Sequence, residues 1–163
     1  MIFGCVAALF IAACQDSETA KKEFTGNEAT YALSPGSDYA IDGTVTFKEK
    51  TDGSTLVILQ LNGTEGALQH PVHLHAGDIS TPDADIAALL NPVAGSTGRS
   101  ETILRALSDE SSINYSQLLG LDACIKVHLA AAGPDKDIIL AGGNIGKDAS
   151  ASGRLKFGVC KSE

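Results

Sequence analysis

Histidine is rare in this 163-residue chain, and its distribution is uneven. Three of the four histidines lie in the stretch His70-Pro71-Val72-His73-Leu74-His75. The fourth, His128, lies in a second alternating run, residues 123–129. Imidazole is the side chain that most often binds transition metals and that moves protons near neutral pH. These two runs are therefore the first place to look for chemistry.

Alternation predicts where these side chains point. Successive side chains of a β-strand lie on opposite faces, so Val72 and Leu74 share one face while His73 and His75 share the other. By the same rule His128 lies opposite the aliphatic side chains of its own run. If the aliphatic sets face a common core, the three imidazoles project from the outside of the sheet, and two neighbouring strands gather them into one patch.

Such a patch is a candidate metal site. Neutral imidazoles suit copper, zinc or nickel better than calcium or magnesium, so we expect His73, His75 and His128 to bind one transition-metal ion, copper first and zinc as the alternative. His70 is a candidate fourth ligand, because Pro71 can break the strand regularity; a loop histidine is the simpler interpretation. The alternative for all of them is a structural role in a module that binds no metal.

The strands that must position the histidines are short and separated by turn residues, which is typical of an all-β domain. The pattern predicts a Greek-key β-sandwich or barrel with short helices in connecting loops. Asp52-Gly53 predicts a hairpin, and Gly142 to Gly146 predict a turn. The expected strands are residues 41–47, 55–61, 70–75, 102–107, 123–130, 137–141 and 154–160.

Two segments interrupt the β pattern. Residues 76–98 predict a long connection with a helical turn or two at 84–90, and residues 114–120 predict a short helix that ends at Gly120. Within the long connection Asp78, Asp83 and Asp85 either support the metal ligands by hydrogen bonds or only solvate the loop.

The N-terminus predicts export. Residues 1–13 form an apolar run too short to span a bilayer, as in a signal peptide. Ile11-Ala12-Ala13-Cys14 resembles the lipobox of bacterial lipoproteins, which implies that Cys14 is lipidated and that residues 14–29 form a flexible linker before a domain at 30–163. The alternatives are an ordinary signal peptide with a coincidental cysteine, or a buried first strand.

The two remaining cysteines, Cys124 and Cys160, form an even pair in an exported chain, which favours a disulfide. The alternative is thiolate metal ligation by Cys124, which shares a face with His128. The formal charge of −8 argues against a broad nucleic-acid-binding patch. Membrane contact is then expected through the lipid alone, and no protein partner is indicated.

Several motifs in the same order resemble the bacterial chordin-type (CHRD) domain family between about residues 31 and 146. They are Gly43-Thr44-Val45-Thr46-Phe47, the 70–75 histidine stretch, Leu90-Asn91-Pro92-Val93 with Ser96-Thr97-Gly98, Tyr115 to Leu119, and Ile125-Lys126-Val127-His128. The resemblance implies an extracellular β-domain and a location in the bacterial cell envelope, at the outer membrane or cell surface. It implies no particular activity.

A more distant similarity is to Cu/Zn superoxide dismutases. His73-Leu74-His75-Ala76-Gly77-Asp78 and Val127-His128 are similar to that family's copper-ligand strands, and residues 153–160 are loosely similar to its C-terminal end. A histidine for the metal-bridging position and a zinc-ligand cluster at 76–98 are both missing. The similarity implies a copper-type three-histidine site, whereas a copper-dependent redox enzyme is the weaker alternative and no catalytic residue is assigned.

Overall fold

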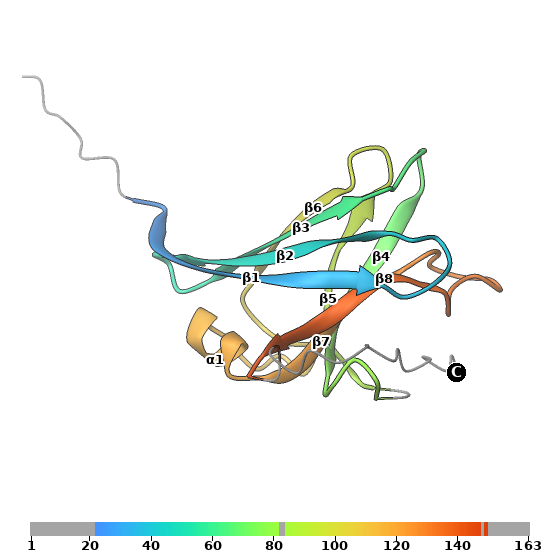
Figure 1. Cartoon of the computed structure of the whole chain (residues 1–163). Helices are drawn as coiled ribbons and strands as arrows, with labels where there is room; N and C mark the ends of the chain where they lie inside the picture. The colour runs from blue at the N-terminus through green and yellow to red at the C-terminus, as the bar shows by residue number, and fades with distance from the viewer. Residues whose placement is uncertain (1–21, 82–83, 148, 150–163) are drawn as a thin grey trace, which may run out of the picture.

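The computed structural model describes residues 22–81, 84–147 and 149. Within them the chain forms eight strands and one short helix (Figure 1). The elements are β1 Phe24–Pro35, β2 Asp42–Lys50, β3 Thr55–Asn62, β4 Gln69–Ala76, β5 Ile86–Ala94, β6 Arg99–Leu104, α1 Tyr115–Leu119, β7 Asp122–His128 and β8 Ile139–Gly146. Within the same residues no helix is long and apolar enough to cross a membrane.

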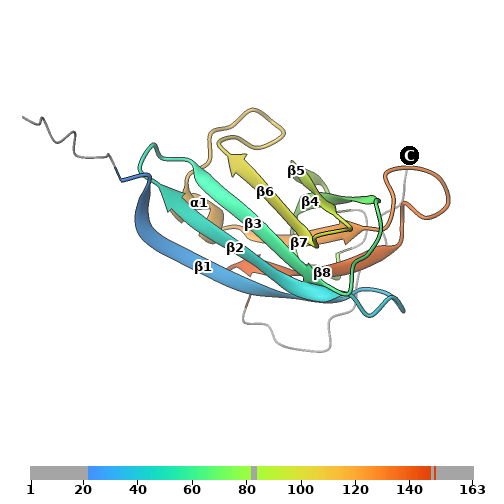
Figure 2. The same ribbon diagram turned by 90° about the horizontal axis from the view of Figure 1, so that it is seen from above.

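The strands close into an antiparallel barrel in the order β1-β2-β3-β6-β5-β4-β7-β8. The all-β prediction is confirmed. Strands β4, β5 and β6 follow one another as hairpins, while β3 pairs with β6 and β7 pairs with β4, which is the Greek-key arrangement. Figure 2 shows β1, β2, β3 and β6 on one side of the barrel and β4, β5, β7 and β8 on the other.

The aliphatic side chains selected by alternation fill the barrel. One continuous buried cluster contains Ile41, Val45, Phe47, Val57, Leu59, Leu61, Val72, Leu74, Ile125 and Val127. Leu129 lies just past the end of β7 and packs against this cluster while remaining partly exposed. Burial of these side chains fixes the register of β4 and β7, because a one-residue slip would turn the apolar set outward.

Turn chemistry also follows the sequence. Gly53 adopts a φ of 85° between β2 and β3, and the Lys50 amide donates to the Ser54 carbonyl to close the predicted hairpin. At α1 the Asn114 side chain accepts from the Gln117 amide while the Gln117 side chain accepts from the Asn114 amide. The predicted helix begins at this reciprocal capping box, and Gly120 is its C-cap.

The prediction of a helical turn at 84–90 is wrong, because residues 86–94 form strand β5. Ala88, Leu90 and Val93 point into the core, and the whole segment pairs with β4. Ala and Leu favour helices in isolation, but an open edge of β4 and a core to fill override that weak preference. The long connection 76–98 is therefore shorter than expected and contains a strand.

Two other expectations differ from the structure. Gly142 to Gly146 belong to β8 and form no turn. A Cβ at Gly143 would stand 2.3 Å from the Ala32 carbonyl oxygen, so glycine there lets β8 approach β1 closely. Strand β1 begins at Phe24, inside the stretch 14–29 expected to be a linker. The signal peptide, Cys14, the expected strand at 154–160 and Cys160 lie outside the described residues.

The barrel has two thin seams. Strands β8 and β1 share two paired positions, and β5 and β6 share the single pair Ala94 and Arg99. Side chains bridge the second seam. The Asn91 amide donates to the Thr102 hydroxyl, and its side-chain nitrogen donates to the Glu101 carbonyl at 2.6 Å. Pro92, which has no amide hydrogen, occupies the next position of the same seam.

Candidate metal centre

Strands β4 and β7 are hydrogen-bonded neighbours, as the histidine hypothesis requires. Val72 lies opposite Val127, and His73 lies opposite Lys126. Paired residues of antiparallel strands point to the same side of the sheet, so both histidines of β4 share the outer face with Lys126 and with His128, two residues further along β7. The predicted convergence of three imidazoles on one face is confirmed.

The three rings are close enough to share one ion. One nitrogen from each of His73, His75 and His128 can be chosen so that all three atoms lie within 4.8 Å of one another. The ring centroids of His73 and His128 are 4.7 Å apart, those of His73 and His75 are 5.6 Å apart, and those of His75 and His128 are 6.3 Å apart. No carboxylate joins this group within the described part of the chain.

Two of the imidazoles are held in a defined tautomer. The Nδ1 atom of His75 lies 2.8 Å from the Ala84 carbonyl oxygen, and Nδ1 of His128 lies 3.0 Å from the Lys136 carbonyl oxygen. A carbonyl only accepts, so Nδ1 must carry the proton and donate in both residues. The Nε2 lone pair of each ring is then available. Both Nε2 atoms are buried and have no hydrogen-bond partner among the described residues.

The patch is less open than alternation implies. His75 and His128 are only 2 % and 4 % exposed, and His73 is half-buried. The expectation of a surface site is correct for the direction of the side chains and wrong for their burial. The loops that follow β4 and β7 cover the face and supply the Ala84 and Lys136 carbonyls. Sequence alternation carries no information about such cover.

Burial keeps the cluster neutral. Desolvation, together with the neighbouring His128 and His75, lowers the pKa of His73 to about 4. Desolvation also lowers the pKa of His75 and the pKa of His128, and the charge of Lys126 lowers both further. The Ala84 and Lys136 carbonyls oppose these shifts without reversing them. All three rings are consequently neutral at pH 7, which is the state that binds metals.

Asn144 holds the loop after β4 in place. Its side-chain oxygen accepts from the Ile79 amide at 2.7 Å, and its side-chain nitrogen donates to the Asp78 carboxylate. Ile79 is thereby packed against the barrel with only 1 % of its surface exposed. Of the three loop aspartates, Asp78 has this supporting role, with a pKa lowered first by the Ser80 hydroxyl. Asp83 lies outside the described residues.

Lys126 is the residue that the sequence patterns missed. It lies on the outer face of β7 beside the histidines, yet it is completely buried. A lysine on an outward position ordinarily indicates solvent, so the sequence offered no signal for this burial. On the neighbouring strand β5, Leu89 pairs with His73 and is 68 % exposed, and Ile86 pairs with His75. The open side of the cluster therefore has an apolar rim.

The remaining sequence candidates are not part of the three-histidine group. His70 is part of β4 and is buried, with Nδ1 3.1 Å from the Leu129 carbonyl oxygen, and it does not join the three-histidine group. Cys124 is buried on β7 opposite His75 and is not among the grouped ligands either. The disulfide expected between Cys124 and Cys160 involves a residue outside the described ranges.

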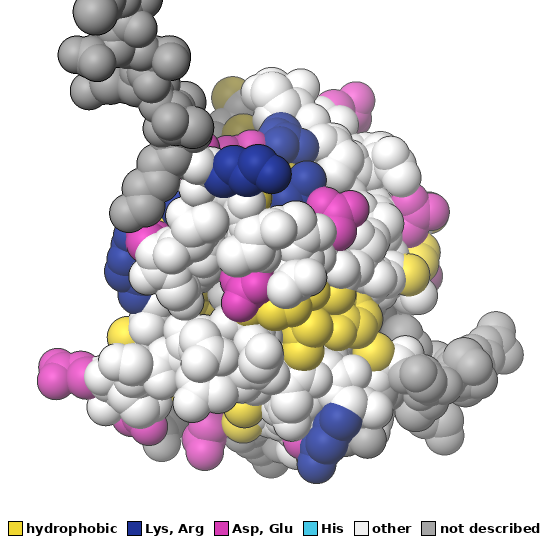
Figure 3. All heavy atoms as spheres, turned by 90° about the vertical axis from the view of Figure 1, so that its left-hand side faces the viewer, with side chains coloured by type: hydrophobic (Ala, Val, Ile, Leu, Met, Phe, Trp, Pro, Cys, Tyr) yellow, Lys and Arg dark blue, Asp and Glu magenta, His cyan; other side chains and the backbone are white. Residues whose placement is uncertain are grey.

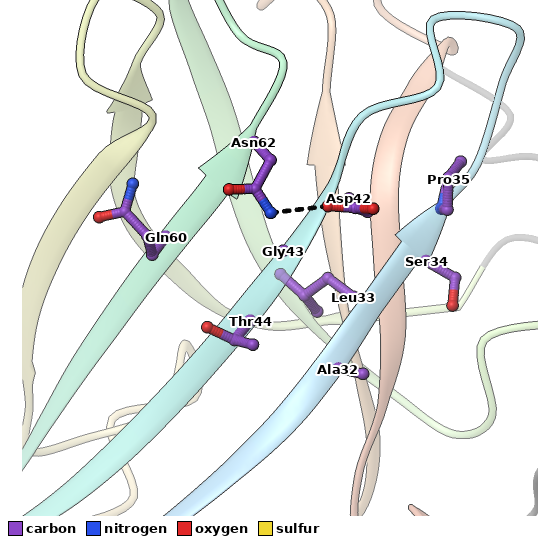
Figure 4. Close-up of a pocket in the computed structure, with 9 residues that line it drawn as sticks. All are labelled: Ala32, Leu33, Ser34, Pro35, Asp42, Gly43, Thr44, Gln60 and Asn62. Carbon is purple, nitrogen blue, oxygen red and sulfur yellow. Dashed lines mark hydrogen bonds between the residues drawn. The ribbon is translucent and has the colours of Figure 1, made fainter.

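A groove of about 520 Å³ lies elsewhere, at the end of the barrel where β1 and β3 end and β2 begins. Figure 4 shows Asn62 donating to Asp42, with Thr44 and Gln60 alongside on the same strands. Among the described residues that line it, Asp42 is the only one with a titratable side chain. On the face of the molecule shown in Figure 3, acidic side chains are scattered and no histidine is visible. As far as the structure describes the chain, neither region gathers titratable side chains as the three histidines do.

Comparison with protein-family models finds no match, and neither the curated proteins nor the solved structures contain a significant match to this chain.

Proposed function

We propose that this protein binds one transition-metal ion, copper first and zinc as the alternative, through His73, His75 and His128. The observation that carries the proposal is the pair of buried Nε2 atoms on His75 and His128, which find no hydrogen-bond partner among the described residues. Leaving a buried polar atom without a partner costs about 1–3 kcal/mol. Two such atoms converging with a third imidazole are best accounted for by a shared ligand.

The arrangement around the imidazoles supports the same function. Metal-binding histidines commonly donate their second ring nitrogen to a carbonyl or carboxylate, which fixes the tautomer and the direction of the lone pair. Ala84 and Lys136 do this for His75 and His128. The lowered imidazole pKa values mean that few protons have to be displaced when the ion binds at pH 7.

We further propose that the domain is a CHRD-type module exported to the bacterial cell envelope and anchored by a lipid on Cys14. The support is the apolar run at 1–13, the lipobox-like 11–14 sequence and the ordered CHRD-like motifs. In that location the lipid supplies the membrane contact, and the acidic chain has no nucleic-acid partner. A Cys14→Ser variant that still partitions with membranes would contradict the anchor.

The metal proposal is tested by titrating copper and zinc into the purified domain, the His128→Ala variant and the His70→Ala variant. His70 is a matched control because it is also 4 % exposed and also contacts a backbone carbonyl through Nδ1. Wild type and His70→Ala should each bind one ion. His128→Ala should lose more than about 100-fold in copper affinity, beyond the effect of losing a supporting hydrogen bond.

Thermal unfolding of each variant without metal separates ligand loss from unfolding. Equal copper affinity in wild type and folded His128→Ala would overturn the site. Wild-type protein that binds neither ion would favour the alternative, an interaction module whose histidines are structural.

A further inference from the structure

The three imidazoles of the cluster are not held in the same way. The Nδ1 atoms of His75 and His128 donate to the Ala84 and Lys136 carbonyls, at 2.8 and 3.0 Å. Among the described residues, no group forms a hydrogen bond with the His73 ring. A hydrogen bond to the second ring nitrogen is what usually fixes the direction of a metal-binding imidazole. His73 is therefore the member of the cluster whose ring is free to turn.

Exposure to solvent divides the three imidazoles in the same way. His75 and His128 are buried, whereas His73 is half-buried. The residue that pairs with His73 on β5 is Leu89, and it is 68 % exposed. The face of the barrel is thus open to solvent on the side where His73 lies. A ligand dissolved in water reaches the cluster at His73 first.

The ring positions place His73 next to both buried imidazoles. Its centroid is 4.7 Å from that of His128 and 5.6 Å from that of His75, while the two buried rings are 6.3 Å apart. His75 and His128 form a fixed pair on the buried side, and His73 adds the third nitrogen from the solvent side. Side chains near solvent change rotamer within nanoseconds, whereas buried and hydrogen-bonded ones are slower.

We propose that His73 is the exchangeable ligand of this site, so that the protein passes copper to, or receives it from, an imidazole-bearing acceptor by ligand exchange. The inference rests on the metal binding proposed above. In the first step, the bond between the His73 nitrogen and the ion breaks as a bond from the acceptor's imidazole nitrogen forms. One neutral nitrogen ligand replaces another, so no electron or proton moves. His75 and His128 keep their Nδ1 protons and retain the ion until the acceptor has bound it.

The experiment measures Cu(II) affinity and the visible absorption of bound Cu(II) in wild type, His73→Ala, His128→Ala and His70→Ala. Each protein is titrated without imidazole and with imidazole at a concentration that leaves wild type loaded. His70→Ala is the matched control, because His70 is a buried β4 histidine that does not join the cluster.

His73→Ala should retain at least about tenfold more Cu(II) affinity than His128→Ala, because it keeps both imidazoles whose tautomers are fixed. Added imidazole should raise the affinity of His73→Ala by about tenfold and restore the wild-type absorption, since the vacated position faces solvent. The same imidazole should leave the affinity of His128→Ala unchanged, because the position of that ring is covered. His70→Ala should behave as wild type throughout. Rescue of both cluster variants to the same extent, or of neither, would overturn the proposal.

A second measurement needs no variant and therefore does not depend on whether the variants fold. Free histidine is mixed with copper-loaded wild type, and the rate of copper transfer is followed at increasing histidine concentration. The rate should rise with histidine concentration, because the acceptor takes the place of His73 before the ion leaves. A rate that does not change with histidine concentration would overturn the exchange and leave the metal site intact. Wild type that binds no copper would instead refute the proposed function, and this inference with it.

Discussion

The two sides of the barrel follow the same alternation of inward and outward side chains, but their outward side chains differ in how far they are buried. On β2 the outward Thr44 is exposed and Thr46 and Lys48 are only partly covered. On β7 the outward Cys124, Lys126 and His128 are all buried. Loops that return over β4 and β7 make the difference. An outward position on a β-barrel therefore becomes a site for chemistry only where another part of the chain closes over it.

The largest effect is expected from removing the apolar part of that cover. Ile79→Ala should lower the free energy of unfolding by about 2–4 kcal/mol, because Ile79, in the loop that follows β4, is only 1 % exposed. Ile58→Ala, on the open outer face of β3, should cost about 1 kcal/mol or less. Urea unfolding of both variants measures the contrast. Similar losses at the two positions would mean that the loop adds little burial.

A smaller effect is expected from the hydrogen bonds that hold the same loop. Asn144→Ala should cost about 1–3 kcal/mol, because the Ile79 amide would lose a buried acceptor. Asn62→Ala removes an exposed bond to Asp42 on the open side and should stay within about 0.5 kcal/mol. Hydrogen exchange should show faster exchange at the Ile79 amide in Asn144→Ala only. Unchanged protection there would show that Asn144 is not what holds the loop.

The smallest effect concerns pH. In the unfolded chain His73 titrates near 6.5, whereas in the folded protein burial lowers its pKa to about 4. Between these values the unfolded state binds more protons, so metal-free stability should fall as the pH drops from 6.5 towards 4. The half-buried ring is partly screened by solvent, which limits the loss to about 1–2 kcal/mol.

His73→Gln should weaken this pH dependence without abolishing it, because burial also lowers the pKa of His75 and of His128. Copper affinity should likewise hold to below pH 6.5, because burial lowers the pKa of all three ligand histidines. A pH profile of stability that is identical in wild type and His73→Gln would contradict the assignment.

Much of this architecture follows from local patterns. Period-two spacing placed Val72, Leu74 and Val127 in the core and so oriented His73, His75 and His128 correctly. The burial of Lys126 and the role of Asn144 could not be predicted in this way, because both depend on which loop folds over which strand. Strand β5 was missed for a related reason, since its conformation is decided by pairing with β4 and not by its own residue preferences.

The thin seam between β5 and β6 has a consequence for self-association of the protein. Two strands that barely pair leave backbone groups able to accept a strand from another molecule, which is how β-proteins begin to aggregate. Here the Asn91 side chain donates to the Glu101 carbonyl, and the Asn91 backbone amide donates to the Thr102 hydroxyl. Pro92 has no amide hydrogen to donate. These contacts block the addition of a strand from another molecule, although β5 and β6 share only one regular pair. The seam is therefore protected against self-association.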